Sequence, residues 1–310
     1  MVAPFLSTIP GAKAQTAADR LTFVVPYPSG GITDMAARAL AERMSAQLGQ
    51  TIVVENRPGG GSRIGIESVQ RAPADGRTLL FTNTSYAVLP IVDPAARYQP
   101  ESSLVPIGVT ATYGLQLVVS GAVPARTLQE FIAYAKARPG KLSYGSSGLG
   151  SGTHFAGEYF KALTGTYLVH IPYRSTASAL NDVAGGIIDM TMDATAKTLA
   201  DAGRVRILAV LDARRDPRLP DVPTAAEAGL PDLRFTSWVG LLAPAGTPPS
   251  VVERLSLAMN ASLRDPRLQA RLQDMGMHPT GGGPEQMLKQ IRDDIALHRR
   301  IVAQARLRFE

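Results

Sequence analysis

Hydrophobic and polar positions form a regular pattern from residue 21 onward. The run LTFVVPYP at residues 21–28 is short, apolar and rich in strand-forming residues, which predicts a strand. The turn SGG follows, and residues 34–49 then carry apolar side chains at the spacing of a helix face, with a stop at Gly49. The pattern predicts a strand, a loop and a helix, in that order.

The next segment repeats this order. TIVVEN at residues 51–56 predicts a second strand and RTLLFTN at 77–83 a third, while the turn RPGGGS and a helix lie between them. Because strands alternate with helices, we expect an α/β fold with a mainly parallel sheet that helices cover on both faces.

The middle of the chain forms a second unit of the same kind, which the pattern predicts at residues 122–233. Its first helix is expected to begin after the N-cap Thr127 and to stop at Gly140. The strands predicted here are LQLVVS, KLSYGSS, TYLVHIPY, IIDMTMDA and VRILAVL. FTSWVGLLAPAG, at residues 235–246, then predicts a strand that returns to the first unit, and the remainder is helical.

A chain of 310 residues with 45% hydrophobic composition is long enough to divide into two domains. We therefore expect lobe 1 to consist of residues 21–121 and 234–310, and lobe 2 of residues 122–233. Residues 1–20 lack the basic start of a secretory signal, yet AKA before Gln15 is typical of a signal-peptidase site. We interpret them as the remnant of an export signal, the alternative being a disordered tail.

Composition excludes several classes of protein. The net charge of +6 comes from scattered arginines, with neither an RNA-binding aromatic signature nor zinc-ligand spacing, so we expect no nucleic-acid partner. The chain has no cysteine, which excludes thiolate catalysis, cysteine-bound zinc and disulfides. No apolar run approaches the roughly 20 residues of a membrane-spanning helix. Four widely spaced histidines predict no metal site, and nothing indicates a cofactor.

Two loops fit the position where open parallel sheets bind ligands, beyond the carboxyl ends of the strands. They are PYPSGGITD at residues 26–34 and GSSGLGSGTH at 145–154. Each brings backbone N–H groups, small side chains and hydroxyls to the start of a helix, where the helix dipole favours an anion. The sequence therefore predicts an anion at each loop, or one anion shared between them.

More specific chemistry finds little support in these loops. A nucleophile elbow needs a second glycine two residues after its serine, but Leu149 stands at that position after Ser147. The glycine patterns of a dinucleotide-binding fingerprint and of a phosphate-binding Walker loop are also incomplete. A serine hydrolase or transferase remains the alternative function, with Ser147 or Ser151 activated by His154 and oriented by Asp34 or Asp193.

Several of these residues have a plain structural interpretation as well. His154 is as readily explained by packing between sheet and helix as by ligand contact. For Tyr27, Tyr86 and Trp238 we expect core packing, although each follows or begins a strand where a cleft would lie. For the glycine-rich turn at residues 58–62 we prefer an ordinary tight turn.

Five segments in order resemble the Bug-type solute receptors, the extracytoplasmic binding proteins of tripartite tricarboxylate transporters. They are FVVPYPSGGITDMAARALAERM, VVENRPGGGSRIG, YGSSGLGSGTHFAGEYF, IPYRSTASALNDVAGGIID and SWVGLLAPAGTP. Each motif alone is weak, but together they cover the chain from about residue 21.

The resemblance implies a two-lobed periplasmic binding protein of the Venus-flytrap, type II-like class, with two crossovers between α/β lobes. It implies a monomeric periplasmic receptor, not an enzyme, that captures a small mono-, di- or tricarboxylate for a membrane permease. Backbone amides, hydroxyls and waters would hold the ligand. The residues that would line its site are Tyr27, Ser29, Gly30, Gly31, Ile32, Thr33, Asp34, Thr84, Ser85, Ser147, Gly148, Leu149, Gly150, Ser151, His154, Arg174 and Asp193.

Departures from the family pattern qualify this picture. Ile32 stands where the family often has a third glycine, which predicts a narrower pocket or a ligand with an apolar body. Ser175 stands where the family often has a glycine after the Pro-Tyr-Arg segment. Arg174 has two interpretations, contact with a second carboxylate or a place at the rim of the cleft. A third hypothesis, an effector-sensing domain of a cytoplasmic regulator, is disfavoured because no helix-turn-helix segment precedes Leu21.

Overall fold

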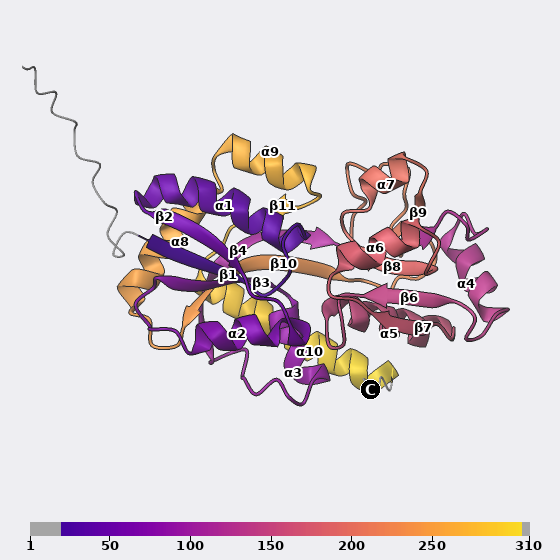
Figure 1. The fold of residues 1–310 in the computed structure, drawn as a ribbon, viewed down its shortest axis with the longest axis horizontal. Coiled ribbons are helices and arrows are strands. Elements are labelled where there is room, and N and C mark those ends of the chain that lie inside the picture. Colours follow the sequence, from indigo (N-terminus) through magenta and orange to yellow (C-terminus); the bar gives the residue numbers. More distant parts are fainter. Residues whose placement is uncertain (1–19, 306–310) are drawn as a thin grey trace, which may run out of the picture.

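The computed structural model describes residues 20–305 and divides them between two sheets (Figure 1). Within this part of the chain, the first sheet has six strands in the order β11-β4-β10-β3-β1-β2, and the second has five in the order β7-β6-β8-β5-β9. Helices cover both sheets, so the expected two-lobed α/β fold is confirmed. Residues 1–19, on which the export-signal interpretation falls, lie outside the described residues.

The elements of the first lobe come from both ends of the chain. In chain order they are β1 (Arg20–Val25), α1 (Ile32–Leu48), β2 (Thr51–Asn56), η2 (Gly60–Ser62), α2 (Arg63–Gln70), β3 (Thr78–Asn83), α3 (Ser85–Val92), β4 (Leu104–Gly114), β10 (Thr236–Pro244), α8 (Pro249–Ser262), α9 (Pro266–Asp274), β11 (His278–Pro279) and α10 (Pro284–Ala305).

The elements of the second lobe are continuous in sequence. They are β5 (Gln116–Ser120), α4 (Leu128–Lys136), β6 (Ser143–Ser146), α5 (Gly152–Thr164), β7 (Val169–Pro172), α6 (Thr176–Ala184), β8 (Met190–Asp193), α7 (Lys197–Asp201) and β9 (Val205–Val210).

Both sheets are mixed, and the parallel strands are those that alternate with helices. β1 lies between β2 and β3 and is parallel to both, and β6 is parallel to β7 and β8. The antiparallel pairs involve β10 with β3 and β4, β11 with β4, and β5 with β8 and β9. Four of these strands, β4, β5, β9 and β10, flank the passages between the lobes.

Local sequence signals set several helix ends. α1 ends before Gly49, whose φ of 63° is the left-handed conformation expected of a C-terminal glycine. Thr127 caps α4 as predicted, because its hydroxyl accepts a hydrogen bond from the backbone N–H of Glu130. α4 ends at Lys136, earlier than the predicted stop at Gly140, since Pro139 disfavours helical backbone at the residue before it.

The chain crosses between the lobes at two adjacent places. The N–H of Leu115 donates to the carbonyl of Phe235 at 3.2 Å, the N–H of Leu211 to the carbonyl of Leu115 at 2.7 Å, and the N–H of Phe235 to the carbonyl of Leu211 at 2.7 Å. Three segments that are distant in sequence are therefore joined by backbone hydrogen bonds at the crossing point.

The first crossing falls at Leu115, and the predicted boundary after residue 121 was placed too late, since β5 lies in the second sheet. β4 and β5 are separated by a single residue, so the backbone changes its pairing partners without a turn or a proline to mark the change.

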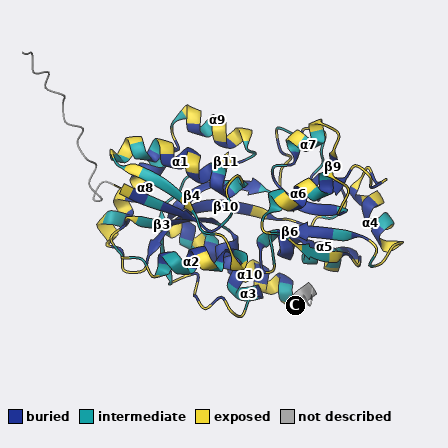
Figure 2. Cartoon of the chain, viewed as in Figure 1, coloured by how far each residue is buried: buried dark blue, intermediate teal, exposed yellow. Residues whose placement is uncertain are grey.

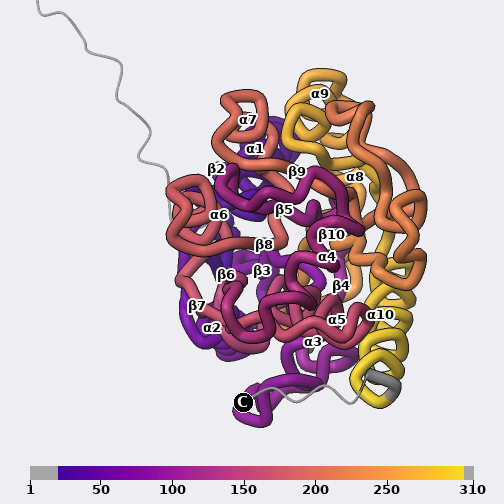
Figure 3. Tube along the Cα trace, turned by 90° about the vertical axis from the view of Figure 1, so that its right-hand side faces the viewer, coloured from indigo at the N-terminus to yellow at the C-terminus, as the bar shows by residue number. Residues whose placement is uncertain are grey.

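The core extends through both lobes, and helices expose only their outer faces (Figure 2). Tyr86 and Trp238 are fully buried, which agrees with their predicted core packing. The Trp238 indole N–H donates to the Asp294 carboxylate of α10 at 2.7 Å. α10 packs on β4 and α3 of the first lobe and extends to the second lobe, where it contacts α5 (Figure 3). Within residues 20–305, no helix has the length and apolar character needed to cross a membrane.

Candidate ligand-binding site

A pocket lies between the lobes at the carboxyl ends of the strands. It occupies about 700 Å³, counted with the open space at its mouth, and we call it the inner chamber. The helices α1, α3, α5 and α6 all begin at or beside its wall. Its lining residues are Tyr27, Pro28, Gly31, Ile32, Thr33, Asn83, Thr84, Ser85, Tyr113, Leu115, Ser147, Gly152, Thr153, Ser175, Thr176, Asp193, Ala194, Phe235 and Ser237.

The electrostatic character of the inner chamber comes from backbone and hydroxyl groups. Its lining contains no lysine, arginine or histidine. The first N–H groups of α1, α5 and α6 lack partners within their own helices, and the helix dipoles make those ends positive. The chamber can therefore hold an anion by N–H and O–H donors, each helix end contributing about 0.3–1 kcal/mol.

The first predicted loop is held by Asp34, which lies behind the chamber wall. Its buried carboxylate accepts hydrogen bonds from the Gly30 N–H and the Asn56 amide, both at 2.9 Å, and pairs with Arg38 at 3.0 Å. Burial raises the pKa of Asp34, but the hydrogen bonds from Arg38, Gly30 and Asn56 outweigh burial and hold it below its usual range. Asp34 therefore fixes the loop, and Gly31 and Ile32 of that loop line the chamber.

Asn83, at the end of β3, connects the first loop to α3. Its side-chain oxygen accepts hydrogen bonds from the Tyr27 hydroxyl at 2.8 Å and from the Ser85 N–H at 2.9 Å. Its side-chain nitrogen donates to the Thr33 hydroxyl at 3.2 Å. Burial raises the pKa of the Tyr27 hydroxyl, against the opposing effect of neighbouring polar side chains, so this group stays a neutral hydrogen-bonding hydroxyl.

The second predicted loop is stabilised by its own side chains. The Ser147 N–H donates to the Thr153 hydroxyl at 3.0 Å, and the Ser151 hydroxyl caps α5 by accepting from the His154 N–H at 3.2 Å. Gly148 and Gly150 have φ of 107° and 74°, a conformation that other residues rarely adopt. These contacts place Ser147 and the start of α5 at the chamber wall.

His154 packs inside the second lobe, where its ring stacks on His170 with 4.1 Å between the ring centroids. Its Nδ1 accepts a hydrogen bond from the Gly150 N–H at 3.2 Å. Burial, and then the nearby His170, lower the pKa of His154 to about 4, so the ring is neutral at pH 7. His154 supports the loop and lies outside the chamber lining.

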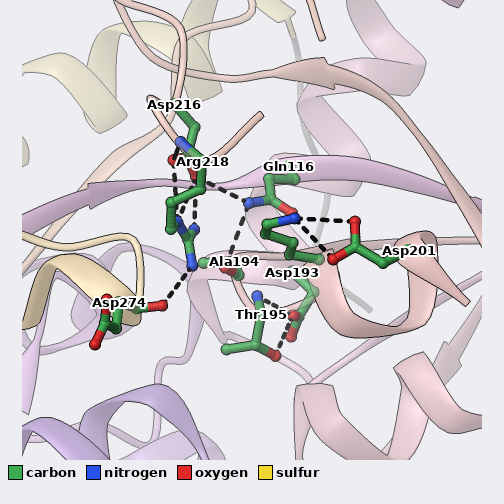
Figure 4. A network of polar contacts seen from close by, with 9 residues as sticks. Gln116, Asp193, Ala194, Thr195, Asp201, Asp216, Arg218 and Asp274 are labelled. Atoms are coloured by element: carbon green, nitrogen blue, oxygen red, sulfur yellow. Dashed lines mark hydrogen bonds and ion pairs between the residues drawn. The ribbon is translucent and has the colours of Figure 1, made fainter. Parts of the chain in front are cut away.

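Asp193 places a carboxyl group in the wall of the inner chamber. It is 3% exposed, and one of its oxygens accepts from the N–H and hydroxyl of Thr195 at 2.5 and 2.6 Å (Figure 4). Burial raises the pKa of Asp193 and outweighs the hydrogen bonds from Thr195 and Thr176 that lower it. Among the described residues, no lysine or arginine pairs with it at salt-bridge distance.

A second group of polar contacts links the lobes beside Asp193. The Gln116 amide donates to the carbonyl of Ala194 at 3.3 Å and to Asp216 at 3.4 Å, and Asp216 pairs with Arg218. Arg218 also donates to the carbonyl of Asp274 in α9 of the first lobe at 3.0 Å (Figure 4). The chamber wall is thereby connected to the opposite lobe.

A second pocket adjoins the first and shares Tyr27, Pro28 and Ser147 with it; we call it the outer chamber. It occupies about 910 Å³, counted with its open mouth. Its lining residues are Pro26, Tyr27, Pro28, Pro58, Gly59, Gly60, Gly61, Ser62, Ser147, Gly148, Ser151, Tyr173 and Arg174. The glycine-rich turn is therefore a wall of this chamber, and its interpretation as an ordinary turn was incomplete.

The predicted site residues fall into three groups. Eight line the inner chamber, and Gly148, Ser151 and Arg174 line the outer one; the inner eight are Tyr27, Gly31, Ile32, Thr33, Thr84, Ser85, Ser147 and Asp193. Six lie outside both linings and shape or flank the loops: Ser29, Gly30, Asp34, Leu149, Gly150 and His154.

Sequence reasoning missed other lining residues. Asn83 ends β3, and Ser175 and Thr176 start α6, so the rule that ligands lie beyond strand ends would have found them. Leu115 and Phe235 line the chamber because the two crossings meet there, which no local pattern reveals.

The geometry does not support a serine hydrolase. The Ser151 hydroxyl caps α5, the Ser147 hydroxyl lies 3.1 Å from the Thr153 hydroxyl, and His154 accepts from a backbone N–H at its Nδ1. Asp34 is engaged by Arg38, and Asp193 by Thr195. These side chains make hydrogen bonds that hold the loops in place, and they do not form a serine–histidine–aspartate arrangement.

Two α/β lobes, paired crossings and a cleft lined by helix N-termini define a solute receptor of the periplasmic binding protein class. Residues 36–307 match the family described as the tripartite tricarboxylate transporter family receptor. The chain belongs to this family, and its members are receptors and not enzymes.

Relatives and solved structures agree with this assignment. Protein BugT of Bordetella pertussis is 33% identical over 300 residues, which cover 94% of this chain and 92% of BugT. The structure of the periplasmic binding protein BugD has a TM-score of 0.89 at 32% identity, covering 94% of this chain and 99% of that one.

Two similar structures contain ligands. R. palustris Rpa4515 with adipate has a TM-score of 0.88 at 36% identity, covering 92% of this chain and 97% of that one. MatC from Rhodopseudomonas palustris with bound malate has a TM-score of 0.87 at 29% identity, covering 91% of this chain and 98% of that one.

Proposed function

We propose that this protein is a periplasmic receptor that binds a small carboxylate between its lobes and delivers it to the membrane permease of a tripartite tricarboxylate transporter. The observation that carries the proposal is the inner chamber, where helix N-termini and hydroxyls converge without a basic side chain. Such a chamber stabilises a carboxylate by hydrogen bonds and helix dipoles. The ligands of Rpa4515 and MatC, adipate and malate, are carboxylates and support this ligand class.

We assign the ligand contacts to both lobes. Gly31, Thr33 and Ser85 face the chamber from the first lobe, and Ser147 and Thr153 face it from the second. A ligand that contacts both lobes stabilises the closed arrangement by its differential affinity for that state. Because one chain supplies every residue of both chambers, a monomer suffices for binding. The description of BugD as a periplasmic protein supports the same location here.

A thermal-shift screen tests this function. The protein is unfolded and refolded to remove bound ligand, and is then heated with mono-, di- and tricarboxylates and with the matched neutral amides. We expect a saturable rise in melting temperature with one class of acid and none with its amide, because a ligand at 100 times its Kd stabilises the folded state by about 2.7 kcal/mol. A rise of the same size with acid and amide, or no rise with any acid, would contradict the proposal.

A further inference from the structure

Arg218 connects the two lobes at a point outside both chambers. It lies in the loop that follows β9, and Leu219 beside it packs in the core of the second lobe with Val118 and Ile207. Its guanidinium group nevertheless reaches the first lobe, where Nη1 donates to the carbonyl of Asp274 at 3.0 Å (Figure 4). Neither Arg218 nor Asp274 lines a chamber. The contact therefore joins the lobes without entering the space in which a ligand would bind.

The partner of Arg218 in the first lobe is the C-terminal end of α9. The last carbonyl groups of a helix have no N–H partner within that helix, and the helix dipole makes this end negative. Asp274 is the last residue of α9, so its carbonyl is one of these groups. A guanidinium group placed there satisfies the carbonyl and interacts favourably with the dipole. Arg218 is thus a C-terminal cap of α9 that the opposite lobe supplies.

The turn after α9 has room for this guanidinium group because residue 276 is a glycine. A Cβ added to Gly276 would overlap the Nη2 and Cζ atoms of Arg218. Gly276 also has a φ of 78°, the left-handed conformation that favours glycine. The backbone of the first lobe and a side chain of the second therefore pack directly against each other.

Asp216 holds the guanidinium group in the direction of α9. Its carboxylate accepts hydrogen bonds from Nε of Arg218 at 3.0 Å and from Nη2 at 2.5 Å, which leaves Nη1 to reach Asp274. Burial raises the pKa of Asp216, but the hydrogen bonds and charge of Arg218, together with nearby His278, outweigh burial and hold it below its usual range. The carboxylate is therefore ionised at pH 7, and it anchors Arg218 to the second lobe.

A short series of contacts connects this ion pair to the wall of the inner chamber. The side-chain amide of Gln116 is buried, and it donates to Asp216 at 3.4 Å and to the carbonyl of Ala194 at 3.3 Å. Gln116 directly follows Leu115, where the chain first crosses between the lobes, and Ala194 lines the inner chamber. The capping of α9 is thereby linked both to the crossing point and to the chamber wall.

From this arrangement we propose that Arg218 is a positioning residue that holds the two lobes closed, in the arrangement of Figure 1 where they contact each other across the cleft. Because Asp216 anchors it in one lobe and α9 binds it in the other, its contact forms only when the lobes are close together. The apparent affinity of a receptor rises with the fraction that is already closed. The inference goes beyond the proposed function, since this contact requires no ligand.

The test measures the distance between the lobes directly. The whole chain has no cysteine, so two introduced cysteines are the only labelling sites. Gln47→Cys on α1 and Thr198→Cys on α7 place a spin label at an exposed position of each lobe. Pulsed electron paramagnetic resonance then gives the distribution of distances between the labels in the full chain, which is unfolded and refolded beforehand to remove bound ligand.

Gly276→Ala removes the contact from the side of the first lobe. The added Cβ displaces the guanidinium group from α9, while Arg218 and Asp216 can still pair. We expect the ratio of closed to open molecules to fall about tenfold, as the loss of one charge-assisted hydrogen bond would give. Gly246→Ala is the matched control, because its φ is 84° and the nearest atom to its Cβ, in Ala74, lies at 3.9 Å. This control should keep the wild-type distribution.

Arg218→Gln removes the same contact from the side of the second lobe. It should open the cleft about as much as Gly276→Ala does. Because both substitutions break one contact, the double variant should be no more open than either single variant.

The outcomes distinguish a contact between the lobes from a role within one lobe. If Gly276→Ala has the wild-type distances, or if the effects of the two substitutions add in the double variant, the inference is overturned. If Arg218→Gln lowers the melting temperature and leaves the distances unchanged, Arg218 only stabilises its own loop, and the inference fails as well. The proposed function stands in each case, since its own test is the binding of a carboxylate.

Discussion

The backbone N–H of Gly152 donates a hydrogen bond across the cleft to the hydroxyl of Ser85, with 3.3 Å between the two atoms. Gly152 begins α5 in the second lobe, and Ser85 begins α3 in the first. Both line the inner chamber, so the lobes are joined at the place where a ligand would also find N–H and hydroxyl donors. Closure of the cleft and ligand binding therefore use the same groups.

Ser85→Ala should weaken ligand binding without unfolding the protein. The substitution removes the acceptor of this bond between the lobes, and a neutral hydrogen bond contributes about 0.5–1.5 kcal/mol, or roughly two- to tenfold in Kd. Calorimetry with the acid identified by the thermal-shift screen measures the change. Ser102→Ala, at an exposed position of the same lobe, is the control. Equal affinities of Ser85→Ala and wild type would show that the bond contributes nothing to closure.

Gly61→Ala should hinder closure by a steric contact. Its Cβ would lie 2.8 Å from the Leu149 carbonyl oxygen of the opposite lobe, so the lobes would have to separate. Gly49→Ala is a matched control, because Gly49 has nearly the same φ, 63° against 60°, and no atom within 4 Å of the added Cβ. Each variant incurs about 1 kcal/mol of backbone strain. We expect at least a tenfold loss of ligand affinity in Gly61→Ala alone, and a similar loss in Gly49→Ala would refute the steric explanation.

The sequence predicts the parts of this site that depend on local rules. The two loops follow strands and precede helices, so their place at the cleft follows from the topology of parallel strands. Gly49 marks the end of α1 by its backbone conformation, and Thr127 marks the start of α4 by capping it. The sequence alone does not decide between packing and ligand contact for His154. Its ring stacks on His170, which lies in a different segment, and this contact forms only in the folded chain.

The remaining parts of the site depend on tertiary contacts. The turn at residues 58–62 has the composition of any tight turn, and it becomes a chamber wall only because the second lobe lies opposite. Leu115 and Phe235 are apolar residues beside strands, with no polar signal near them, yet the crossing of the chain places them in the wall of the inner chamber.

Asp34→Asn should destabilise the first lobe in a pH-dependent way. Since the pKa of Asp34 is lowered in the folded protein, its contribution to stability is present above the ordinary pKa near 4 and is lost as pH falls through the lower, folded value. We expect the variant to lose about 1–3 kcal/mol at pH 7, because it breaks the pair with Arg38. Urea unfolding at pH 7, 4 and 3 should show the difference from wild type narrowing at low pH; a difference independent of pH would contradict this account.

Buried histidines should make the protein sensitive to mild acid. Burial lowers the pKa of His154 and of His298 to about 4, below the ordinary value near 6.5. Between these values the two histidines bind protons in the unfolded chain but not in the folded chain, so their contribution to the free energy of unfolding falls as pH decreases from about 6.5 to 4. In this window each histidine contributes a slope of up to about 1.4 kcal/mol per pH unit. Denaturant titrations of wild type and His154→Gln should show a shallower slope in the variant, and unchanged slopes would refute the assignment.

The most direct test of the central claim is calorimetric titration of Gly31→Asp with the acid that stabilises the wild type. Gly31 is the N-cap of α1 and lines the inner chamber, and an added Cβ meets no atom closer than the Pro28 carbonyl oxygen at 3.8 Å. Aspartate is a favourable N-cap residue, so the variant should fold with unchanged or higher melting temperature. Its carboxylate would occupy the place of the ligand's carboxylate, and binding should be abolished. A variant that still binds the acid with wild-type affinity would show that the ligand does not lie at this helix end.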